Sequence, residues 1–335
     1  MQIAQLGEKQ LIQRLLQKRD DTLNIEDENL IQSYRDDAAL CINSCKYSVF
    51  STDMLIESHH FPVGMTPFEM GAKTVNVNVS DIIAMNAKPT AIVISLALPG
   101  DFSVDDFDAL VDGILYKCNE YDITLIGGDI NEADEVITSA TAIGEVDGGV
   151  RFLNNAHPGD IIATTGSIGD VAGGFDLIYG AGNVDIADSL KDELMDSVFN
   201  PKLPYKTAEY LREHPSIVTS MSDITDGLAS ELGCLCDNNK NCSFKIYEQM
   251  LPYEKDLQTI ADANHKHLYE YLFYFGEEFE LLLTLNSSEY EKHKDMLDDI
   301  TPIGEVIEDS KNRVILVDGN GHESTLKIRG YEHLK

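Results

Sequence analysis

The sequence predicts a mixed α/β protein of the α+β type, built from two domains. Its 335 residues are about the length of two average domains. Short β-branched segments bounded by turn residues alternate with segments whose apolar residues recur at helical spacing. Two near-identical hexapeptides, TAIGEV at 141–146 and TPIGEV at 301–306, lie about one domain apart. We interpret them as the closing strands of two similarly built halves.

The individual elements follow from these local patterns. Strands are predicted at residues 47–50, 91–98, 123–126, 136–143 and 161–165, and helices at residues 6–18, 105–119, 204–213 and 288–297. Residues 72–83 fit both patterns, because valines alternate with asparagines as in a strand while the apolar residues also line one helical face. The following SDIIAMNA continues the helical spacing, so a helix is predicted there.

The two domains are predicted to meet near residue 149. The segment DGGVRFLNNAHPGD at 147–160 is rich in Gly, Asn and Asp, a composition typical of a connection. We therefore assign residues 1–148 to the first domain and residues 149–335 to the second. The first carries most of the aspartate motifs described below, and the second is expected to complete the site.

The charge of the chain excludes several classes of function. Asp and Glu number 58 against 25 Lys and Arg, a formal net charge of −33. Such a chain offers no basic surface for nucleic acid. The longest apolar run, at 91–99, is shorter than the roughly 20 residues of a membrane-spanning helix. The N-terminal MQIAQLGEKQ carries charges where a secretory signal would be apolar, so a cytoplasmic protein is expected.

Aspartates in five contexts are candidate metal ligands rather than solvated surface charges. They are Asp37 in RDDAAL, Asp53 in YSVFSTD after the hydroxyls of Ser51 and Thr52, Asp81 in NVSDIIAM, Asp129 in LIGGD, and Asp223 with Asp226 in SDITDG. Several stand where a predicted strand ends, which aims carboxylates into a cleft. Oxygen ligands without a paired CxxC or a histidine set favour Mg2+ over zinc. Magnesium would also offset the negative charge of a bound phosphate.

The usual nucleotide-binding motifs are absent from the sequence. It contains neither GxxxxGK[ST] nor the HRD and DFG pair of protein kinases. The glycine-rich TTGSIGDVAGG at 164–174 fits either a phosphate cradle at a helix N-terminus or a tight strand-to-helix turn.

An ordered set of motifs covers nearly the whole chain: RDDAAL, STDMLIESHHF, NVSDIIAMNAKPTAIVISLALP, LIGGD, NAHPGDIIATTGSIGDVAGG, SDITDGLASEL, FGEEFELLL and GYEHL. This set resembles the motifs of the thiamine-monophosphate kinase family, within the aminoimidazole ribonucleotide synthetase superfamily. The resemblance implies transfer of the γ-phosphoryl group of ATP to thiamine monophosphate, with several Mg2+ ions. It also implies a homodimer and two α+β domains with ATP bound between them.

The resemblance also assigns roles to individual residues. The positions that match metal ligands are Asp37, Ser51, Thr52, Asp53, Asp81, Asp129, Asp223 and Asp226. The positions that match ATP contacts are Gly128, Asp129 and Thr225, and those that match contacts to the thiamine substrate are His60, Glu277 and Tyr331.

Two departures from the family pattern affect the expected site. The usual GGEDYELL is here FGEEFELL, so Phe275, Glu278 and Phe279 replace glycine, aspartate and tyrosine, and Phe275 adds bulk to the thiamine pocket. Leu153 stands where the family commonly has an arginine that contacts ATP, and Arg151, two residues earlier, is predicted to take that role.

These residues suggest direct in-line transfer, which depends on positioning and charge stabilisation rather than on a protein nucleophile. Two alternatives remain at this point. The first is another ATP-dependent member of the superfamily, such as an aminoimidazole ribonucleotide or selenophosphate synthetase; the latter is disfavoured because Cys41 has no glycine neighbours. The second is an acidic, non-catalytic cation-binding protein.

Overall fold

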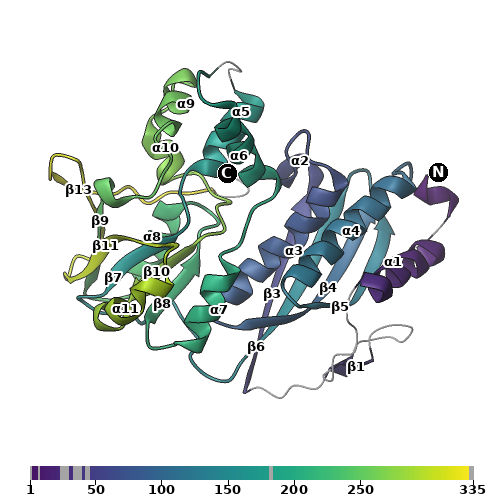
Figure 1. The fold of residues 1–335 in the computed structure, drawn as a ribbon, viewed down its shortest axis with the longest axis horizontal. Coiled ribbons are helices and arrows are strands. Elements are labelled where there is room, and N and C mark those ends of the chain that lie inside the picture. Colours follow the sequence, from purple (N-terminus) through teal and green to yellow (C-terminus); the bar gives the residue numbers. More distant parts are fainter. Residues whose placement is uncertain are drawn as a thin grey trace. The chain divides into compact units, whose positions relative to one another are not determined.

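The computed structural model describes residues 2–6, 8–22, 30–32, 40–41, 46–180 and 184–331. The chain divides into two compact units (Figure 1). Unit 1 comprises Met1–Ile83 and Ala87–Gly148, and unit 2 comprises Ala84–Asn86 and Gly149–Lys335. In the described residues, no helix is both long enough and apolar enough to cross a membrane.

Unit 1 is built on a four-stranded sheet in the order β3-β6-β4-β5. Its strands are β3 (Tyr47–Ile56), β4 (Lys88–Leu98), β5 (Thr124–Glu132) and β6 (Ile137–Val146). Strands β3 and β4 both pair antiparallel with β6, whereas β4 and β5 are parallel and are joined through the helix α4 (Val104–Glu120). The remaining elements are η1 (Ile3–Gln5), α1 (Glu8–Thr22), β1 (Leu30–Gln32), β2 (Leu40–Cys41), α2 (Glu57–His60) and α3 (Pro67–Ala84).

The ambiguous segment is helical, as predicted. In α3, the side chains of Val75, Val79 and Ile82 are fully buried. The alternating asparagines are buried too and are paired: the Tyr121 hydroxyl donates to Asn76 Oδ1 at 2.7 Å, and Asn78 Nδ2 donates to the Thr74 carbonyl at 2.9 Å. Burial of this helix on several sides explains why its sequence lacks a clean polar face.

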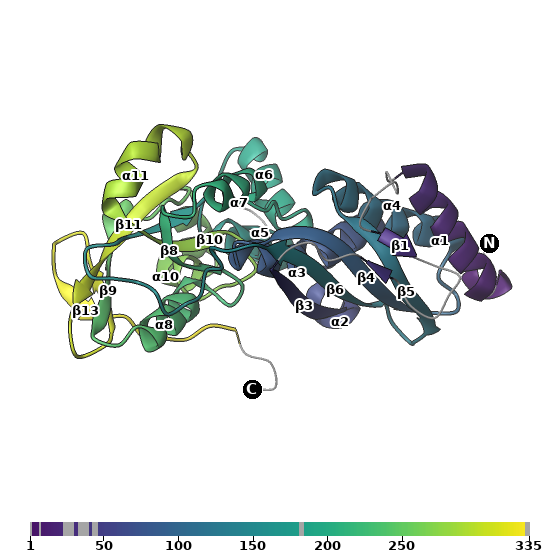
Figure 2. The same cartoon turned by 90° about the horizontal axis from the view of Figure 1, so that it is seen from below.

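Helices α3 and α4 cross at two glycines. An added Cβ at Gly71 would overlap the carbonyl oxygen of Leu110 in α4, and one at Gly113 would overlap the carbonyl oxygen of Phe68 in α3. The close approach packs both helices onto the sheet, while α1 lies beside α4 and β5 (Figure 1, Figure 2).

One face of this sheet is buried under α3, and the other face has exposed side chains. In β6, Thr138, Ala140 and Ala142 are buried on the face that α3 covers, and the residues between them lie on the other face. On that second face Phe50 is 65% exposed and Met54 is 56% exposed. It therefore presents large apolar side chains to the surroundings of unit 1.

Unit 2 is built on a seven-stranded sheet in the order β13-β12-β9-β11-β7-β10-β8. All neighbours are antiparallel except β12 and β9. The strands are β7 (Ile161–Thr165), β8 (Val218–Asp223), β9 (Cys242–Tyr247), β10 (Leu281–Leu285), β11 (Ile300–Glu308), β12 (Val314–Val317) and β13 (Glu323–Thr325).

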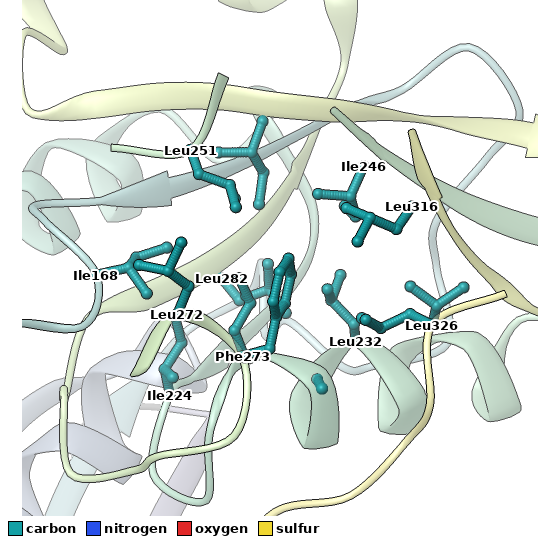
Figure 3. Packing of buried hydrophobic residues seen from close by; sticks show 14 of the residues in the cluster. Ile168, Ile224, Leu232, Ile246, Leu251, Leu272, Phe273, Leu282, Leu316 and Leu326 are labelled. Carbon is teal, nitrogen blue, oxygen red and sulfur yellow. The ribbon is translucent and has the colours of Figure 1, made fainter. Parts of the chain in front are cut away.

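The helices of unit 2 are α5 (Asp170–Tyr179), α6 (Asp188–Phe199), α7 (Tyr205–Glu213), α8 (Leu228–Asn238), η2 (Glu248–Met250), α9 (Leu257–Ala263), α10 (Leu268–Leu272), α11 (Ser287–His293) and η3 (Lys294–Met296). Helices α5, α6, α8, α9 and α10 contribute side chains to one hydrophobic core against the sheet. Figure 3 shows Phe273 in the middle of this core, with Leu282 of β10 and Leu232 of α8 beside it.

The predicted elements are confirmed, with four differences. Asp53, predicted to follow a strand directly, lies inside β3, because the ladder between β3 and β6 runs unbroken from Tyr47 to Ile56. Asp129, predicted at the end of a strand, lies inside β5, which continues to Glu132. The expected helix at 288–297 ends at His293 and is followed by a 3-10 turn. TAIGEV lies in β6, the last strand of unit 1, whereas TPIGEV lies in β11, which β12 and β13 follow, so it does not close unit 2.

Candidate active site

The first group of site residues lies between strand β3 and helix α3. Ser51 and Asp53 alternate along β3 and so share the face that α3 covers. The Ser51 hydroxyl donates to Asp81 Oδ2, and the Asp53 amide donates to Asn78 Oδ1 at 3.0 Å. Asn78 and Asp81 are three residues apart, on one helical face. The structure thus brings together three of the predicted metal-binding residues.

Thr52 lies apart from this group, on the other face of the sheet. Its hydroxyl donates to the carbonyl of Ala140 at 2.8 Å and accepts from the Thr141 hydroxyl at 3.1 Å. The side chain of Thr52 is thereby engaged on β6. Asp37, the remaining candidate from the N-terminal region, lies outside the described residues.

Gly128 and Asp129 lie in β5, at the opposite edge of the sheet from β3. An added Cβ at Gly128 would overlap the carbonyl oxygen of Ile94, so only glycine lets β5 lie this close to β4. The cross-strand register places Gly128 in one row with Ile94 and Asp53, which puts the neighbouring Asp129 on the opposite face. Three strand spacings, about 14 Å, separate β5 from β3. Within unit 1, Asp129 therefore lies apart from Asp53.

His60 is held by the backbone of the last residue of β3. Its Nδ1 lies 3.0 Å from the Ile56 nitrogen and 3.2 Å from the Ile56 oxygen. The carbonyl of His60 accepts a hydrogen bond from Nζ of the buried Lys73 at 2.8 Å. These contacts fix the ring at the end of α2.

The second group of site residues lies in unit 2, where three segments distant in sequence meet. The amide of Glu277 donates to the carbonyl of Thr225 at 2.8 Å, and the amide of Tyr331 donates to the carbonyl of Asp226 at 3.1 Å. Asp223 ends β8 directly before this loop. The structure thus gathers two predicted metal ligands, a predicted ATP contact and two predicted substrate contacts.

Glycines make this convergence possible. An added Cβ at Gly276 would overlap the carbonyl oxygen of Thr225, and one at Gly330 would overlap that of Asp226. Gly227, which follows Asp226, has a φ of 109°, in the left-handed region that side chains disfavour. The glycines of SDITDG, FGEE and RGY therefore permit the backbones to touch.

Glu231 is a further candidate site residue, which the sequence motifs did not identify. It lies in α8 and is buried; burial, together with the charges of Asp223 and Asp226, raises the pKa of its carboxyl group to about 7. Its place in SDITDGLASEL, five residues after Asp226 and in the first turn of the helix, could have marked it. Three acidic side chains here create a strongly negative environment.

The donor set of both groups fits Mg2+. Carboxylate and hydroxyl oxygens are its preferred protein ligands, and the ion keeps several waters instead of demanding a complete protein cage. In the part of the chain that the structure describes, no group of three or more His, Cys, Asp or Glu is arranged to hold a metal.

The glycine-rich segment forms a turn between β7 and α5. The amide of Gly169, at the N-terminus of α5, donates to Oε1 of Glu278 at 2.8 Å. An added Cβ at Gly174 would overlap the carbonyl oxygen of Leu194 in α6. In this structure a protein carboxylate occupies the helix N-terminus, and the later glycine serves helix packing.

Arg151 contacts backbone in unit 2. Its guanidinium donates to the carbonyl oxygens of Gly149 at 2.9 Å, Val150 at 3.2 Å and Pro215. Partial burial lowers the pKa of the guanidinium. These carbonyls engage the side chain in this structure. A contact between Arg151 and ATP stays a prediction.

Phe275 packs against helix α5. Its ring centroid lies 5.1 Å from that of Phe175. The aromatic side chain thus fills space beside the loop that carries Glu277.

Two family models and several individual proteins match this chain. Residues 35–146 match the family model of the AIR synthase related protein, N-terminal domain, and residues 157–317 match that of the AIR synthase related protein, C-terminal domain. The thiamine-monophosphate kinase of Bacillus subtilis is 32% identical over 311 residues, covering 90% of this chain and 92% of that protein. The enzyme of the same name from Pyrococcus abyssi is 33% identical, with coverages of 90% and 91%.

Solved structures agree with this comparison. A thiamine-monophosphate kinase from Stenotrophomonas maltophilia superposes with a TM-score of 0.75 at 27% identity, covering 89% of this chain and 93% of that one. A complex of AaThiL with AMPPCP and TMP superposes with a TM-score of 0.75 at 25% identity, covering 100% and 99%. The hydrogenase maturation protein HypE of E. coli, at 17% identity and a TM-score of 0.75, shares the fold.

Proposed function

The chain belongs to the thiamine-monophosphate kinase family, and from that premise we propose that it transfers the γ-phosphoryl group of ATP to thiamine monophosphate, giving thiamine diphosphate and ADP. The observation that carries this proposal is the convergence in unit 2 of Thr225, Glu277 and Tyr331, which the family resemblance assigns to ATP and to the thiamine substrate. One loop junction thereby joins residues that we propose for both substrates.

Both substrates are anionic, and the protein carries a net charge of −33, so bringing them together requires added positive charge. Bound Mg2+ would supply it and would stabilise charge on the transferring phosphoryl group. In unit 1, Ser51, Asp53 and Asp81 would hold the ion. In unit 2, Asp223 and Asp226 would do so. We keep Asp37, Thr52 and Asp129 as further proposed ligands, from the resemblance alone.

The side chains act by positioning. Gly128, Asp129, Thr225 and Arg151 are proposed to contact ATP, and His60, Glu277 and Tyr331 to contact thiamine monophosphate. The acceptor phosphate has a second pKa of about 6, as phosphorylated side chains do, so it is largely deprotonated at neutral pH. Direct in-line transfer then needs neither a protein nucleophile nor a strong general base.

We also propose that the protein acts in the cytoplasm as a homodimer. The apolar face of the unit 1 sheet, with Phe50 and Met54, supports the dimer, since large exposed apolar side chains mark interfaces. A second copy of this chain would cover that face.

The proposal is tested by comparing acceptors. The protein is incubated with Mg-ATP and, in separate reactions, thiamine, thiamine monophosphate or no acceptor. ADP should form with thiamine monophosphate and be near background in the other two reactions. Equal ADP release in all three would contradict the proposal and indicate another ATP-dependent activity, and absence of turnover would favour the non-catalytic alternative.

A further inference from the structure

Glu278 lies between the proposed substrate residue Glu277 and strand β10, and its side chain points into unit 2. The side chain is buried. Its Oε1 accepts the Gly169 amide hydrogen at 2.8 Å, and the carboxylate also accepts a backbone hydrogen bond from Val171. Glu278 therefore ties the segment before β10 to the first residues of helix α5.

The backbone on both sides of Glu278 adopts a disfavoured conformation. Glu277 has a φ of 65° and Phe279 a φ of 53°, both in the left-handed region that residues other than glycine rarely enter. Such conformations persist only where the surrounding structure holds them in place, and they concentrate at functional sites.

Several contacts hold this segment. The amide of Glu277 donates to Thr225 O at 2.8 Å, and the amide of Phe279 donates to Ile224 O at 3.0 Å. The buried ring of Phe279 adds a packing anchor on the β10 side. Glu278 lies between the two left-handed residues, and its carboxylate binds a different element, the N-terminus of α5.

We propose that Glu278 is a positioning residue: by binding the N-terminus of α5 it holds Glu277 in its left-handed conformation and so directs the Glu277 side chain to thiamine monophosphate. This inference rests on the proposed function, because it concerns that substrate. Without the carboxylate, the segment loses its link to α5, and the strained backbone at residue 277 relaxes towards ordinary dihedral angles.

The test compares steady-state kinetics of the full-length wild type and Glu278→Ala. A misplaced Glu277 should raise the KM for thiamine monophosphate or lower kcat, cutting kcat/KM for this substrate by about tenfold to a hundredfold. The KM for ATP should change by less than about threefold. An unchanged kcat/KM for thiamine monophosphate in a folded Glu278→Ala protein would overturn the inference.

A matched control separates positioning from loss of a helix cap. Asn286 caps α11 in the same unit, its Oδ1 accepting from the amides of Ser288 and Glu289 at 3.1 Å each. Asn286→Ala should lower the unfolding temperature as a lost cap does, while leaving kcat/KM for thiamine monophosphate within about twofold. If Asn286→Ala reduces kcat/KM as much as Glu278→Ala does, Glu278 has only a structural role.

A double variant tests whether Glu278 acts through Glu277. If it does, Glu277→Ala with Glu278→Ala should lose no more kcat/KM than Glu277→Ala alone. Multiplying losses would overturn the inference. Should Glu278→Ala fail to fold, Glu278→Met, which keeps the side-chain length but has no acceptor oxygen for the Gly169 amide, replaces it in the same cycle. A wild-type protein inactive on thiamine monophosphate would instead refute the proposed function.

Discussion

At the scale of single residues, Asp53 is the most direct test of the proposed magnesium chemistry. Its backbone amide, not its carboxylate, makes the contact with Asn78, so Asp53→Asn should preserve the packing of β3 on α3. Loss of one charged ligand should remove several kcal/mol of transition-state stabilisation, lowering kcat by about a hundredfold or more at saturating Mg2+.

The control for this variant is Asp134→Asn, which removes an equal charge from an exposed position between β5 and β6. It should leave kcat unchanged, and both variants should unfold at temperatures close to that of the wild type. Near-normal turnover by Asp53→Asn would rule out a metal-ligand role for this residue.

Glu280 makes a separate prediction about stability. Burial, with smaller contributions from Asp299 and Asp170, raises the pKa of its carboxyl group from 4.5 to about 7, although the Thr165 hydroxyl donates to it. The folded state therefore binds the proton more tightly than the unfolded state. This stabilisation is complete below pH 4.5 and is lost as pH rises through 7, by about 3 kcal/mol in all.

Glu280→Gln should remove this dependence, because the amide stays neutral and retains an acceptor for Thr165. We expect the variant to be more stable than the wild type at pH 8 and close to it at pH 4. Thermal unfolding at both pH values checks this. Glu231, whose pKa is also raised, makes the stability of both proteins depend on pH. The quantity to compare is therefore the difference in stability between the wild type and Glu280→Gln at each pH.

At the scale of elements, the packing of α5 on α6 depends on one glycine. An added Cβ at Gly174 would overlap the carbonyl oxygen of Leu194, so Gly174→Ala must push the two helices apart. Overpacking of this kind costs about 1–3 kcal/mol. Denaturant unfolding should show the loss, whereas Gly148→Ala, where an added Cβ meets nothing within 4 Å, should be nearly neutral. Equal stabilities of the two variants would contradict this packing.

The elements were largely predictable from the sequence because apolar periodicity reports burial. The helix α3 could be predicted from residues 72–83, although its buried asparagines imitate a strand, since the helical spacing continued beyond them. The end of β3 could not, because the pairing of Ser51, Thr52 and Asp53 with β6 is a contact distant in sequence. Local patterns do not carry such register information.

The site was predictable only in part. Motifs identified Thr225, Asp226, Glu277 and Tyr331, and the structure places their backbones in contact. Glu231 and Glu278 were not assigned roles, because what distinguishes them is burial beside other carboxylates or against a helix N-terminus. Both properties arise from tertiary packing. Only the position of Glu231, five residues after Asp226 in SDITDGLASEL, is visible in the sequence.

At the scale of the whole molecule, the exposed apolar face of the unit 1 sheet predicts self-association. Phe50→Glu with Met54→Glu places two charges on this face, and burying them in a dimer would be costly. Sedimentation velocity should show a dimer for the wild type and a monomer for the double variant. Replacing the exposed Tyr179 of unit 2 by Glu is the control and should leave the dimer intact. A monomeric wild type would contradict the homodimer.

The net charge of −33 is also a property of the whole molecule that bears on its need for cations. Part of it lies in the two groups of proposed oxygen ligands around Asp53 and Asp226, where divalent cations would neutralise it. Because both substrates are anions, turnover should depend on Mg2+ throughout, and this dependence belongs to the molecule rather than to any one residue.

Phosphorus NMR of one incubation of the protein with thiamine monophosphate and Mg-ATP tests the proposed phosphoryl transfer directly, because it gives the ratio of the products. Direct transfer predicts that thiamine diphosphate and ADP appear in equal amounts at every time point, with no build-up of inorganic phosphate. Formation of ADP and inorganic phosphate without thiamine diphosphate would contradict the account.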